Sequence, residues 1–224
     1  DTDGGGAGES VSISADGNTI VIGAPDVSSN GSVIVFENIN DTWTQKGAII
    51  TGENANDHLG DANGVSISDD GSVLAVASKY SDLNGVASGD VRVFQWDSAN
   101  WVQMGSNIVG ENTADYSGTI GLSGDGSTLV VGAIFNDGNA QDSGHVRVYK
   151  WNGNDWSQLG EDLDGEGQGD RFGTSVSISY DGSRIAAGSR YNDNANGADA
   201  GQVKLFDWNG SSWSQVGNDI LGEF

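Results

Sequence analysis

Polar and apolar residues alternate in four short stretches that are spaced evenly along the chain. In each stretch serine, glycine or threonine alternates with an aliphatic residue, and the equivalent positions are Val11, Val65, Ile120 and Val176. The steps between them are 54, 55 and 56 residues. Alternation with a period of two is typical of a β-strand with one buried face. Its return at a nearly constant spacing predicts an internal repeat, which decides the fold.

A tryptophan recurs in the same step. Trp43, Trp101, Trp156 and Trp213 each stand two residues before a glutamine. Because both markers advance together, the repeat covers the whole chain and occurs four times.

Each repeat contains four strand signals. The alternating stretch is followed by an Asp-Gly pair, such as Asp16-Gly17, which is the strongest short signal for a tight hairpin. An apolar run such as TIVIGA (19–24) predicts the second strand, and a segment such as GDVRVFQW (89–96) predicts the third. The recurring tryptophan begins the fourth strand after a short hairpin loop.

Four short strands in each unit of about 55 residues predict an all-β fold of the β-propeller type, with four blades. One blade cannot bury both of its faces, whereas stacked blades can. We therefore expect a single domain over 1–224, with blades at about 1–53, 54–111, 112–166 and 167–224. Four blades could close as a small ring, giving a monomer, or form an open half-ring that pairs with a second copy to give eight blades.

Composition removes several classes of ligand. The chain of 224 residues has a formal net charge of −23 at pH 7, so its surface repels phosphate backbones and anionic lipids. We expect no nucleic-acid binding. No apolar run approaches the ~20 residues of a membrane helix, so we expect no membrane insertion. The chain has no cysteine, which excludes disulfides and thiolate metal sites.

The fourth repeat resembles the FG-GAP repeat, a family that includes the propeller head of integrin α-subunits and many secreted bacterial and algal proteins. Phe172-Gly173 supplies the FG, and GQVKLFDW (201–208) supplies the strand downstream. In the first repeat Gly23-Ala24-Pro25 supplies the GAP. The resemblance implies a propeller that binds ligands outside the cell.

The resemblance also implies calcium in a D-x-D-x-D-G-x-x-D loop between the first and second strands. In the first repeat these positions hold Ser12, Ser14, Asp16 and Ile20. A hard cation takes about six to eight oxygen ligands, and one carboxylate with two hydroxyls supplies too few. We therefore do not transfer this calcium site to the present chain.

The loops between the second and third strands of the last two repeats offer other calcium ligands. They carry closely spaced acids and amides, namely Asp137, Asn139, Asp142, Asp193, Asn196 and Asp199. Such side chains, with glycines between them, can wrap a calcium ion, which is the one cofactor that we consider. They also close their own turns by hydrogen bonding to the backbone, and we favour this second interpretation.

Tryptophans at a second repeated position are candidates for ligand binding. Trp96, Trp151 and Trp208 stand just before the outer hairpin of their repeats. An exposed tryptophan could stack on a sugar ring. A tryptophan opposite another on the neighbouring strand more often packs against it, and we favour packing here too.

Paired acids recur where the chain passes from one blade to the next. The pairs are Glu53/Asp57, Glu111/Asp115 and Glu166/Asp170. A hydrolase that uses two carboxylates needs them in one site, whereas a role at every crossing suits acceptors for backbone N–H groups. We expect this structural role, with the basic residues of the third strands nearby: Arg92, Arg147 and Lys204.

The sequence contains no short catalytic motif of the zinc-protease, serine-hydrolase or nucleotide-binding type. We therefore expect that the chain is not an enzyme. The favoured function is a binding or adhesion module of a secreted or cell-surface protein, with a protein or a glycan as its ligand. The alternatives are a lectin-like carbohydrate-binding propeller and a structural spacer or assembly unit.

Overall fold

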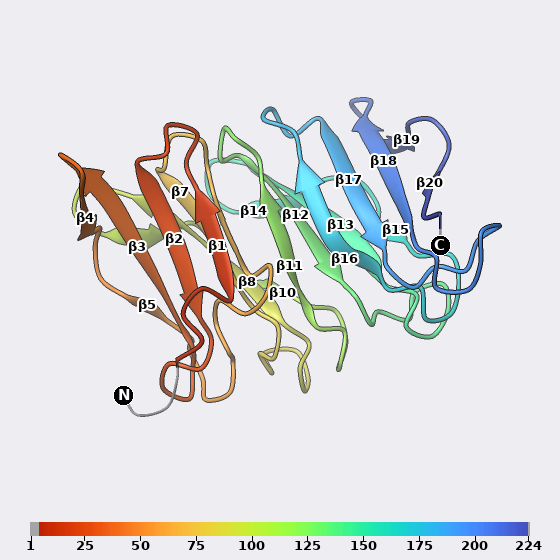
Figure 1. Ribbon diagram of the computed structural model, residues 1–224, viewed down its shortest axis with the longest axis horizontal. Helices are drawn as coiled ribbons and strands as arrows, with labels where there is room; N and C mark the ends of the chain where they lie inside the picture. The colour runs from red at the N-terminus through yellow and green to blue at the C-terminus, as the bar shows by residue number, and fades with distance from the viewer. Residues whose placement is uncertain (1–4, 224) are drawn as a thin grey trace.

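The computed structural model describes residues 5–223, and within them the chain forms strands, turns and loops without any helix. The strands make four antiparallel sheets that follow one another along the chain. Figure 1 shows the first sheet at the left in red and orange and the fourth at the right in blue. The predicted all-β fold and its four blades are confirmed. Among the described residues, no helix is long and apolar enough to cross a membrane.

The strands of the first two blades occupy residues 10–51 and 65–109. In the first blade they are β1 (Ser10–Ile13), β2 (Thr19–Ala24), β3 (Ser32–Ile39), β4 (Thr42–Gln45) and β5 (Ile50–Thr51). In the second they are β6 (Val65–Ile67), β7 (Val73–Ser78), β8 (Asp90–Trp96), β9 (Trp101–Gln103) and β10 (Ile108–Val109).

The strands of the last two blades occupy residues 117–164 and 172–221. In the third blade they are β11 (Ser117–Leu122), β12 (Thr128–Ala133), β13 (His145–Trp151), β14 (Trp156–Gln158) and β15 (Leu163–Asp164). In the fourth they are β16 (Phe172–Ile178), β17 (Arg184–Ser189), β18 (Gln202–Trp208), β19 (Trp213–Gln215) and β20 (Ile220–Leu221). The outermost residues of the predicted first and fourth blades, 1–4 and 224, lie outside the described residues.

The short fifth strand of each blade was not predicted. β5, β10, β15 and β20 have two residues each and pair with the third strand, beyond the part of it that pairs with the fourth. The chain turns away between these two pairings at a glycine, for example Gly47, whose φ of 80° lies in the left-handed region that glycine tolerates.

The alternating first strand faces two neighbours at once. In β6, the buried side chains of Val65 and Ile67 belong to the hydrophobic cluster shared with the first blade. The backbone N–H groups of the same two residues donate to the hydroxyls of Ser10 and Ser12 in β1, at 3.1 Å each. We call the face of a blade that packs against the preceding blade its leading face, and the opposite one its trailing face.

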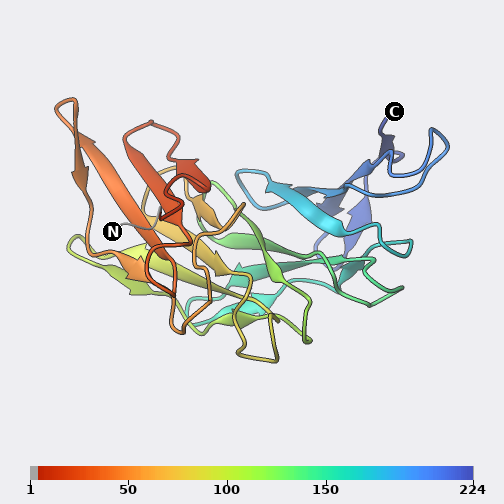
Figure 2. The same ribbon diagram turned by 60° about the horizontal axis from the view of Figure 1, so that its bottom comes forward.

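Hydrophobic clusters fill the three seams between successive blades. At the first seam, for example, Val21, Val33 and Val35 of the first blade meet Leu74 and Val76 of the second. Equivalent positions meet at the second and third seams. The closely packed pairs of described strands lie within one blade or join neighbouring blades, and the first and fourth blades stand at opposite ends of an open arc (Figure 2).

Trp156 is the anchor residue best suited to a test of seam packing. Its side chain is 8% exposed, and its Nε1 donates to the carbonyl of Met104 in the preceding blade at 3.1 Å. Trp156→Ala should lower the free energy of unfolding by about 3–5 kcal/mol because it leaves a cavity between two blades.

Denaturant unfolding measures this loss, with Tyr180→Ala as the control. Tyr180 is 64% exposed, so its truncation should cost less than about 1 kcal/mol. Equal losses for the two variants would contradict the importance of the buried anchor.

Candidate cation site between the second and third blades

The aspartates of the inter-blade linkers have the structural role that the sequence predicts. A carboxylate oxygen of Asp57, Asp115 and Asp170 accepts a hydrogen bond from a backbone N–H three residues earlier, at 2.7, 3.0 and 2.9 Å. The three linkers therefore take up the same local conformation, and each brings its glutamate to an equivalent place.

The glutamates of the linkers pair with the basic residue on the third strand of the next blade. Glu53 lies 3.9 Å from Arg92, Glu111 lies 3.3 Å from Arg147, and Glu166 contacts Lys204. The predicted neighbourhood of these basic residues is confirmed.

Two further residues complete a polar group at each seam. One begins the third strand of the following blade, and the other precedes its short fifth strand. We call these three sets linker groups: Glu53, Asp90 and Asn107; Glu111, His145 and Asp162; Glu166, Gln202 and Asp219.

In the first and third linker groups a hydrogen-bond donor lies between the acidic side chains. Asn107 donates through Nδ2 to Glu53 at 3.0 Å and to Asp90 at 3.3 Å. In the third group the ammonium of Lys204 contacts Glu166 and lies 4.0 Å from Asp219. In each of these groups a donor therefore faces both acids.

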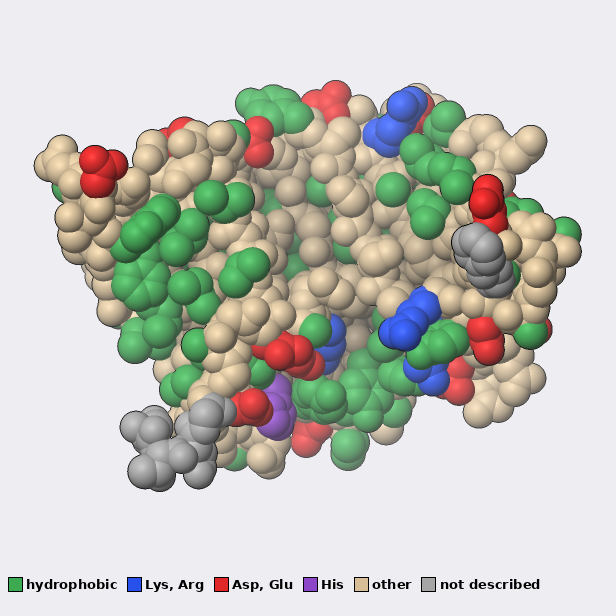
Figure 3. All heavy atoms as spheres, in the orientation of Figure 1, with side chains coloured by type: hydrophobic (Ala, Val, Ile, Leu, Met, Phe, Trp, Pro, Cys, Tyr) green, Lys and Arg blue, Asp and Glu red, His purple; other side chains and the backbone are tan. Residues whose placement is uncertain are grey.

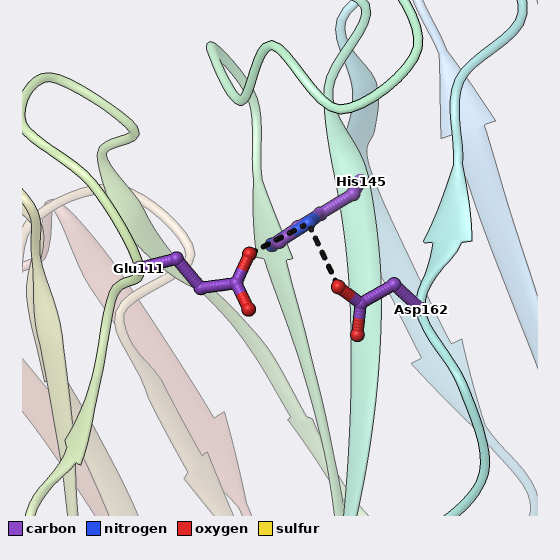
Figure 4. A group of neighbouring side chains, drawn as sticks. All are labelled: Glu111, His145 and Asp162. Carbon is purple, nitrogen blue, oxygen red and sulfur yellow. Dashed lines mark ion pairs between the residues drawn. The ribbon is translucent and has the colours of Figure 1, made fainter.

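In the second linker group the amide donor of the first group is replaced, while Arg147 still pairs with Glu111. Asp162 stands where the first group has Asn107, so it brings a carboxylate in place of an amide. Figure 4 shows His145 between the two carboxylates, with Nδ1 3.8 Å from Glu111 Oε2 and 3.8 Å from Asp162 Oδ2. These separations are too long for hydrogen bonds.

His145 is a buried side chain without a partner. It is 1% exposed, and its Nε2 has no hydrogen-bond partner within the described part of the chain. Asp162, in contrast, is held in place by Gln158, whose Nε2 donates to Oδ1 at 2.6 Å. Leaving a buried polar group unpaired costs about 1–3 kcal/mol, and this atom is not the one that faces the carboxylates, which is Nδ1.

Burial determines the charges of this group. It lowers the pKa of His145 to about 4, with a further contribution from Arg147, so the imidazole is neutral near pH 7. Burial also raises the pKa of Glu111, although Arg147 acts in the opposite direction. The imidazole that lies between Glu111 and Asp162 is thus neutral.

The geometry suits a divalent metal ion. One nitrogen of His145 and one oxygen each of Glu111 and Asp162 lie within 4.8 Å of one another. A tetrahedral ion with bonds of about 2.0–2.1 Å needs ligand atoms ~3.4 Å apart, a few tenths of an ångström closer than the 3.8 Å observed here. An open cavity of about 500 Å³ adjoins the group, and Asp115, Asp137 and Asp164 also line it.

The predicted calcium ligands of the third blade form a hydrogen-bonded loop. Asp137 Oδ1 accepts the backbone N–H of Asp142 at 2.8 Å, and Asn139 Nδ2 donates to the carbonyl of Gly165 at 3.0 Å. Of these residues, Asp137 alone is among those that line the cavity beside the second linker group.

The equivalent loop of the fourth blade repeats this arrangement. Asp193 Oδ1 accepts the N–H of Asp199 at 2.8 Å, and Asn196 Nδ2 donates to the carbonyl of Gly222 at 2.7 Å. Calcium binding by either loop stays a prediction.

The Asp-Gly hairpins use their carboxylates internally. Ser14 donates to Asp16 at 2.6 Å, and this bond is the main reason why the pKa of Asp16 falls to about 2. In the fourth blade, hydrogen bonds from Ser183 and Ser179 lower the pKa of Asp181 to about 2. The position of the family's calcium loop is thus a hydrogen-bonded turn in this chain.

The tryptophan candidates lie at the seams. The rings of Trp96, Trp151 and Trp208 pack at 5.3, 5.6 and 5.4 Å against the anchor tryptophans of their own blades. The anchors in turn donate through Nε1 to a backbone carbonyl of the preceding blade. A role of the three candidates in ligand binding stays a prediction.

A ladder of aromatic rings, which was not predicted, joins residues of the linkers to residues that follow the second strands. Successive ring contacts of 5.2, 5.4 and 5.2 Å join His58 to Tyr80, Tyr80 to Tyr116 and Tyr116 to Phe135. The guanidinium of Arg171 continues the ladder at 4.5 Å from Phe135. The available sequence signal was the residue after each linker aspartate, which is His58, Tyr116 or Arg171.

Comparison with known proteins supports the fold and the repeat. Residues 163–206 match the profile of the FG-GAP repeat, which confirms the resemblance noted in the sequence. None of the curated proteins matches this chain.

Solved structures similar to this chain are propellers that extend beyond its length. The periplasmic gluconolactonase of Pseudomonas aeruginosa has a TM-score of 0.60 and 17% identity, over 94% of this chain and 56% of its own. A candidate 6-phosphogluconolactonase of Bacteroides uniformis has a TM-score of 0.60 and 16% identity, over 93% and 53%. The β-propeller domain of the trilobed protease of Pyrococcus furiosus has a TM-score of 0.54 and 10% identity, over 96% and 58%. The chain thus spans about half the length of these structures, and at such identities the likeness concerns the fold.

The expectation that the chain is not an enzyme is wrong as an inference from missing motifs. Several of the similar propellers bear the names of lactone-hydrolysing enzymes. Catalytic groups on a propeller come from loops far apart in the sequence, so no short motif needs to be present.

The first linker group provides a test of its electrostatics. Asp90 is 3% exposed, and burial raises the pKa of its carboxyl from 3.8 to about 6. The folded chain therefore holds this proton up to about pH 6, and the stability that it contributes is lost as the pH rises from 3.8 through 6. The full loss amounts to roughly 3 kcal/mol.

Asp90→Asn should abolish this loss, because an amide does not ionise. The free energy of unfolding of the variant, relative to the unchanged chain, should rise between pH 4.5 and pH 8 by roughly 2–3 kcal/mol. Denaturant unfolding at both pH values measures the difference. A difference that does not change with pH would show that burial does not control this carboxyl.

Proposed function

We propose that this chain is a ligand-binding propeller module that holds a divalent metal ion at Glu111, His145 and Asp162. The observation that carries the proposal is the buried His145, whose Nδ1 lies 3.8 Å from each of two carboxylates without a hydrogen bond to either. The other two linker groups serve as internal comparisons, since in each an amide or ammonium lies between both acids, whereas Arg147 of the second group pairs with Glu111.

The ligand types favour a transition ion over calcium. Calcium takes oxygen ligands, whereas an imidazole nitrogen with two carboxylates suits zinc or manganese. A bound ion would take up the lone pair of His145 Nδ1 and offset the charge of Glu111 and Asp162. It would also leave a coordination position open, because this chain supplies three ligands at this place.

The favoured ligand is a glycan. The cavity beside the linker group is lined by acidic and amide side chains, which accept hydrogen bonds from hydroxyl groups. A metal ion at its edge would coordinate two neighbouring hydroxyls. A glycan ligand fits a secreted or cell-surface protein, which is also where the FG-GAP resemblance points.

Metal-assisted hydrolysis of a sugar lactone is the second candidate function. The observation that favours it is the open coordination position, at which a metal-bound water could form a nucleophile at neutral pH. The names of the gluconolactonase-type propellers agree with such a substrate, although their likeness to this chain concerns the fold.

Zinc binding tests the site. Calorimetric titration with zinc chloride should show one ion per chain, and Asp162→Asn should weaken binding at least tenfold because it supplies the donor found in the first group. Asp219→Asn makes the same change in the third group, where Lys204 already faces the acids, and should leave zinc binding unchanged. Far-ultraviolet circular dichroism checks that both variants are folded.

The possible outcomes test the metal site and the proposed function separately. Equal zinc binding by the chain and by Asp162→Asn would refute the assigned site. Zinc binding that depends on Asp162, without metal-dependent binding on a glycan array, would keep the site and refute the glycan. Metal-dependent release of acid from gluconolactone would then favour the second function.

Calcium in the long loops is a separate proposal, with Asp193 and Asp199 as ligands in the fourth blade. Calcium at a hundredfold excess over Kd should stabilise the chain by about 2.7 kcal/mol. A melting scan at matched ionic strength measures this shift against a chelator control. A full shift in the Asp193→Ala, Asp199→Ala double variant would exclude these ligands.

A further inference from the structure

The leading face of the first blade is apolar and open. Its side chains occupy the positions that fill the seams elsewhere: Val11, Ile13, Ile20, Ile22, Phe36 and Trp43. Val11 and Ile13 are 67% and 60% exposed, whereas their equivalents Val65 and Ile67 are 6% exposed each. This face therefore has the composition of a seam without its partner.

The trailing face of the fourth blade is the complementary half of such a seam. Its aliphatic residues include Val203 and Ile220, which are 36% and 58% exposed, whereas the equivalent Val146 is fully buried. A shallow cavity that both residues line lies on this face.

Glycines on the trailing faces of other blades show which segment of a following blade would fill this cavity. A Cβ on Gly23 would lie 2.1 Å from the carbonyl oxygen of Gly60 in the next blade, and a Cβ on Gly132 would lie 2.3 Å from that of Gly173. These glycines thus accommodate the segment that opens the following blade, which is a loop at Gly60 and the start of β16 at Gly173. At the equivalent Gly188 the atoms nearest to such a Cβ belong to the fourth blade itself. The fourth blade keeps the glycine, but the following loop is not supplied by the described residues.

Both open faces look in the same direction. Figure 3 shows one hydrophobic patch over β1–β3 and another over β17 and β18, both turned toward the viewer. The two ends of a half-ring have this arrangement, since the blades of a closed or spiral stack would turn their end faces toward each other.

We propose that two copies of this chain join through these faces into a closed ring of eight blades. The trailing face of the fourth blade of each copy receives the leading face of the first blade of the other. A twofold axis along the centre of the ring relates the two new seams, so the contact closes and does not propagate. The proposal is independent of the metal site.

A second copy is proposed as the partner because its packing would continue the seams that the structure already contains. The new seam would be a fourth instance of the packing that the chain repeats three times, with the same strands on each side. The similar propellers, of whose length this chain covers about half, have the size that two copies would make. The charge of −23 on each copy opposes association, so salt should strengthen the dimer.

Light scattering after size exclusion tests the proposal on the 224-residue chain. We expect twice the monomer mass of 23.1 kDa, with a larger dimer fraction at higher salt. Val11→Lys should shift the mass to that of the monomer, as should Ile220→Lys on the opposite face. The matched control is Val86→Lys, at a loop residue that is 68% exposed and belongs to neither face, which should stay dimeric.

A mixture of the two face variants gives a sharper result. In a pair made of one Val11→Lys chain and one Ile220→Lys chain, one of the two seams is intact, so the mixture should recover part of the dimer. A monomer mass for the unchanged chain across the concentration range would overturn the proposal and leave blades outside this chain as the occupants. A dimer that survives both substitutions would overturn the choice of faces.

Discussion

The packing of one blade on the next is the interaction on which the rest of the structure depends. A single sheet of this size has two faces and cannot bury either alone, so every blade is stabilised through its neighbours. The aliphatic side chains of each leading face fill a seam, and serine hydroxyls on the trailing side of the first strand accept N–H groups of the next blade. The even spacing of the sequence repeat is the direct result, because each blade must present the same two surfaces.

The fold could be predicted from the sequence because the same pattern of strands and turns occurs four times. One alternating stretch is weak evidence for a strand, but the same stretch before an Asp-Gly pair in every unit is strong evidence. The two-residue fifth strands escaped prediction because such short pairings depend on a glycine turn and on the length of the third strand. The openness of the arc depends on the angle between blades, which side-chain pattern does not encode.

The candidate site could not be predicted for a related reason. Its residues come from a linker, from the start of β13 and from the turn before β15, so Glu111, His145 and Asp162 have no motif in common. Comparison of the repeats with each other would have found them. Glutamate is constant across the three linkers. The position of Asp162 holds asparagine in the preceding repeat, and the position of His145 holds aspartate or glutamine in the other two linker groups.

The seams are alike in packing but differ in their polar groups, and this difference restricts the proposed metal site to one place. At a fourth seam, made by two copies, the positions of the basic residue and of Asp162 would hold Ile34 and Ile49. That seam would therefore carry no linker group capable of binding an ion, and its leading face would be more apolar than the other three. Such a division suits an interface that must form between separate chains, because apolar area drives association while buried charge has to be matched. A closed ring would then hold two metal sites on opposite sides of the axis, each at a seam that folds within a single chain.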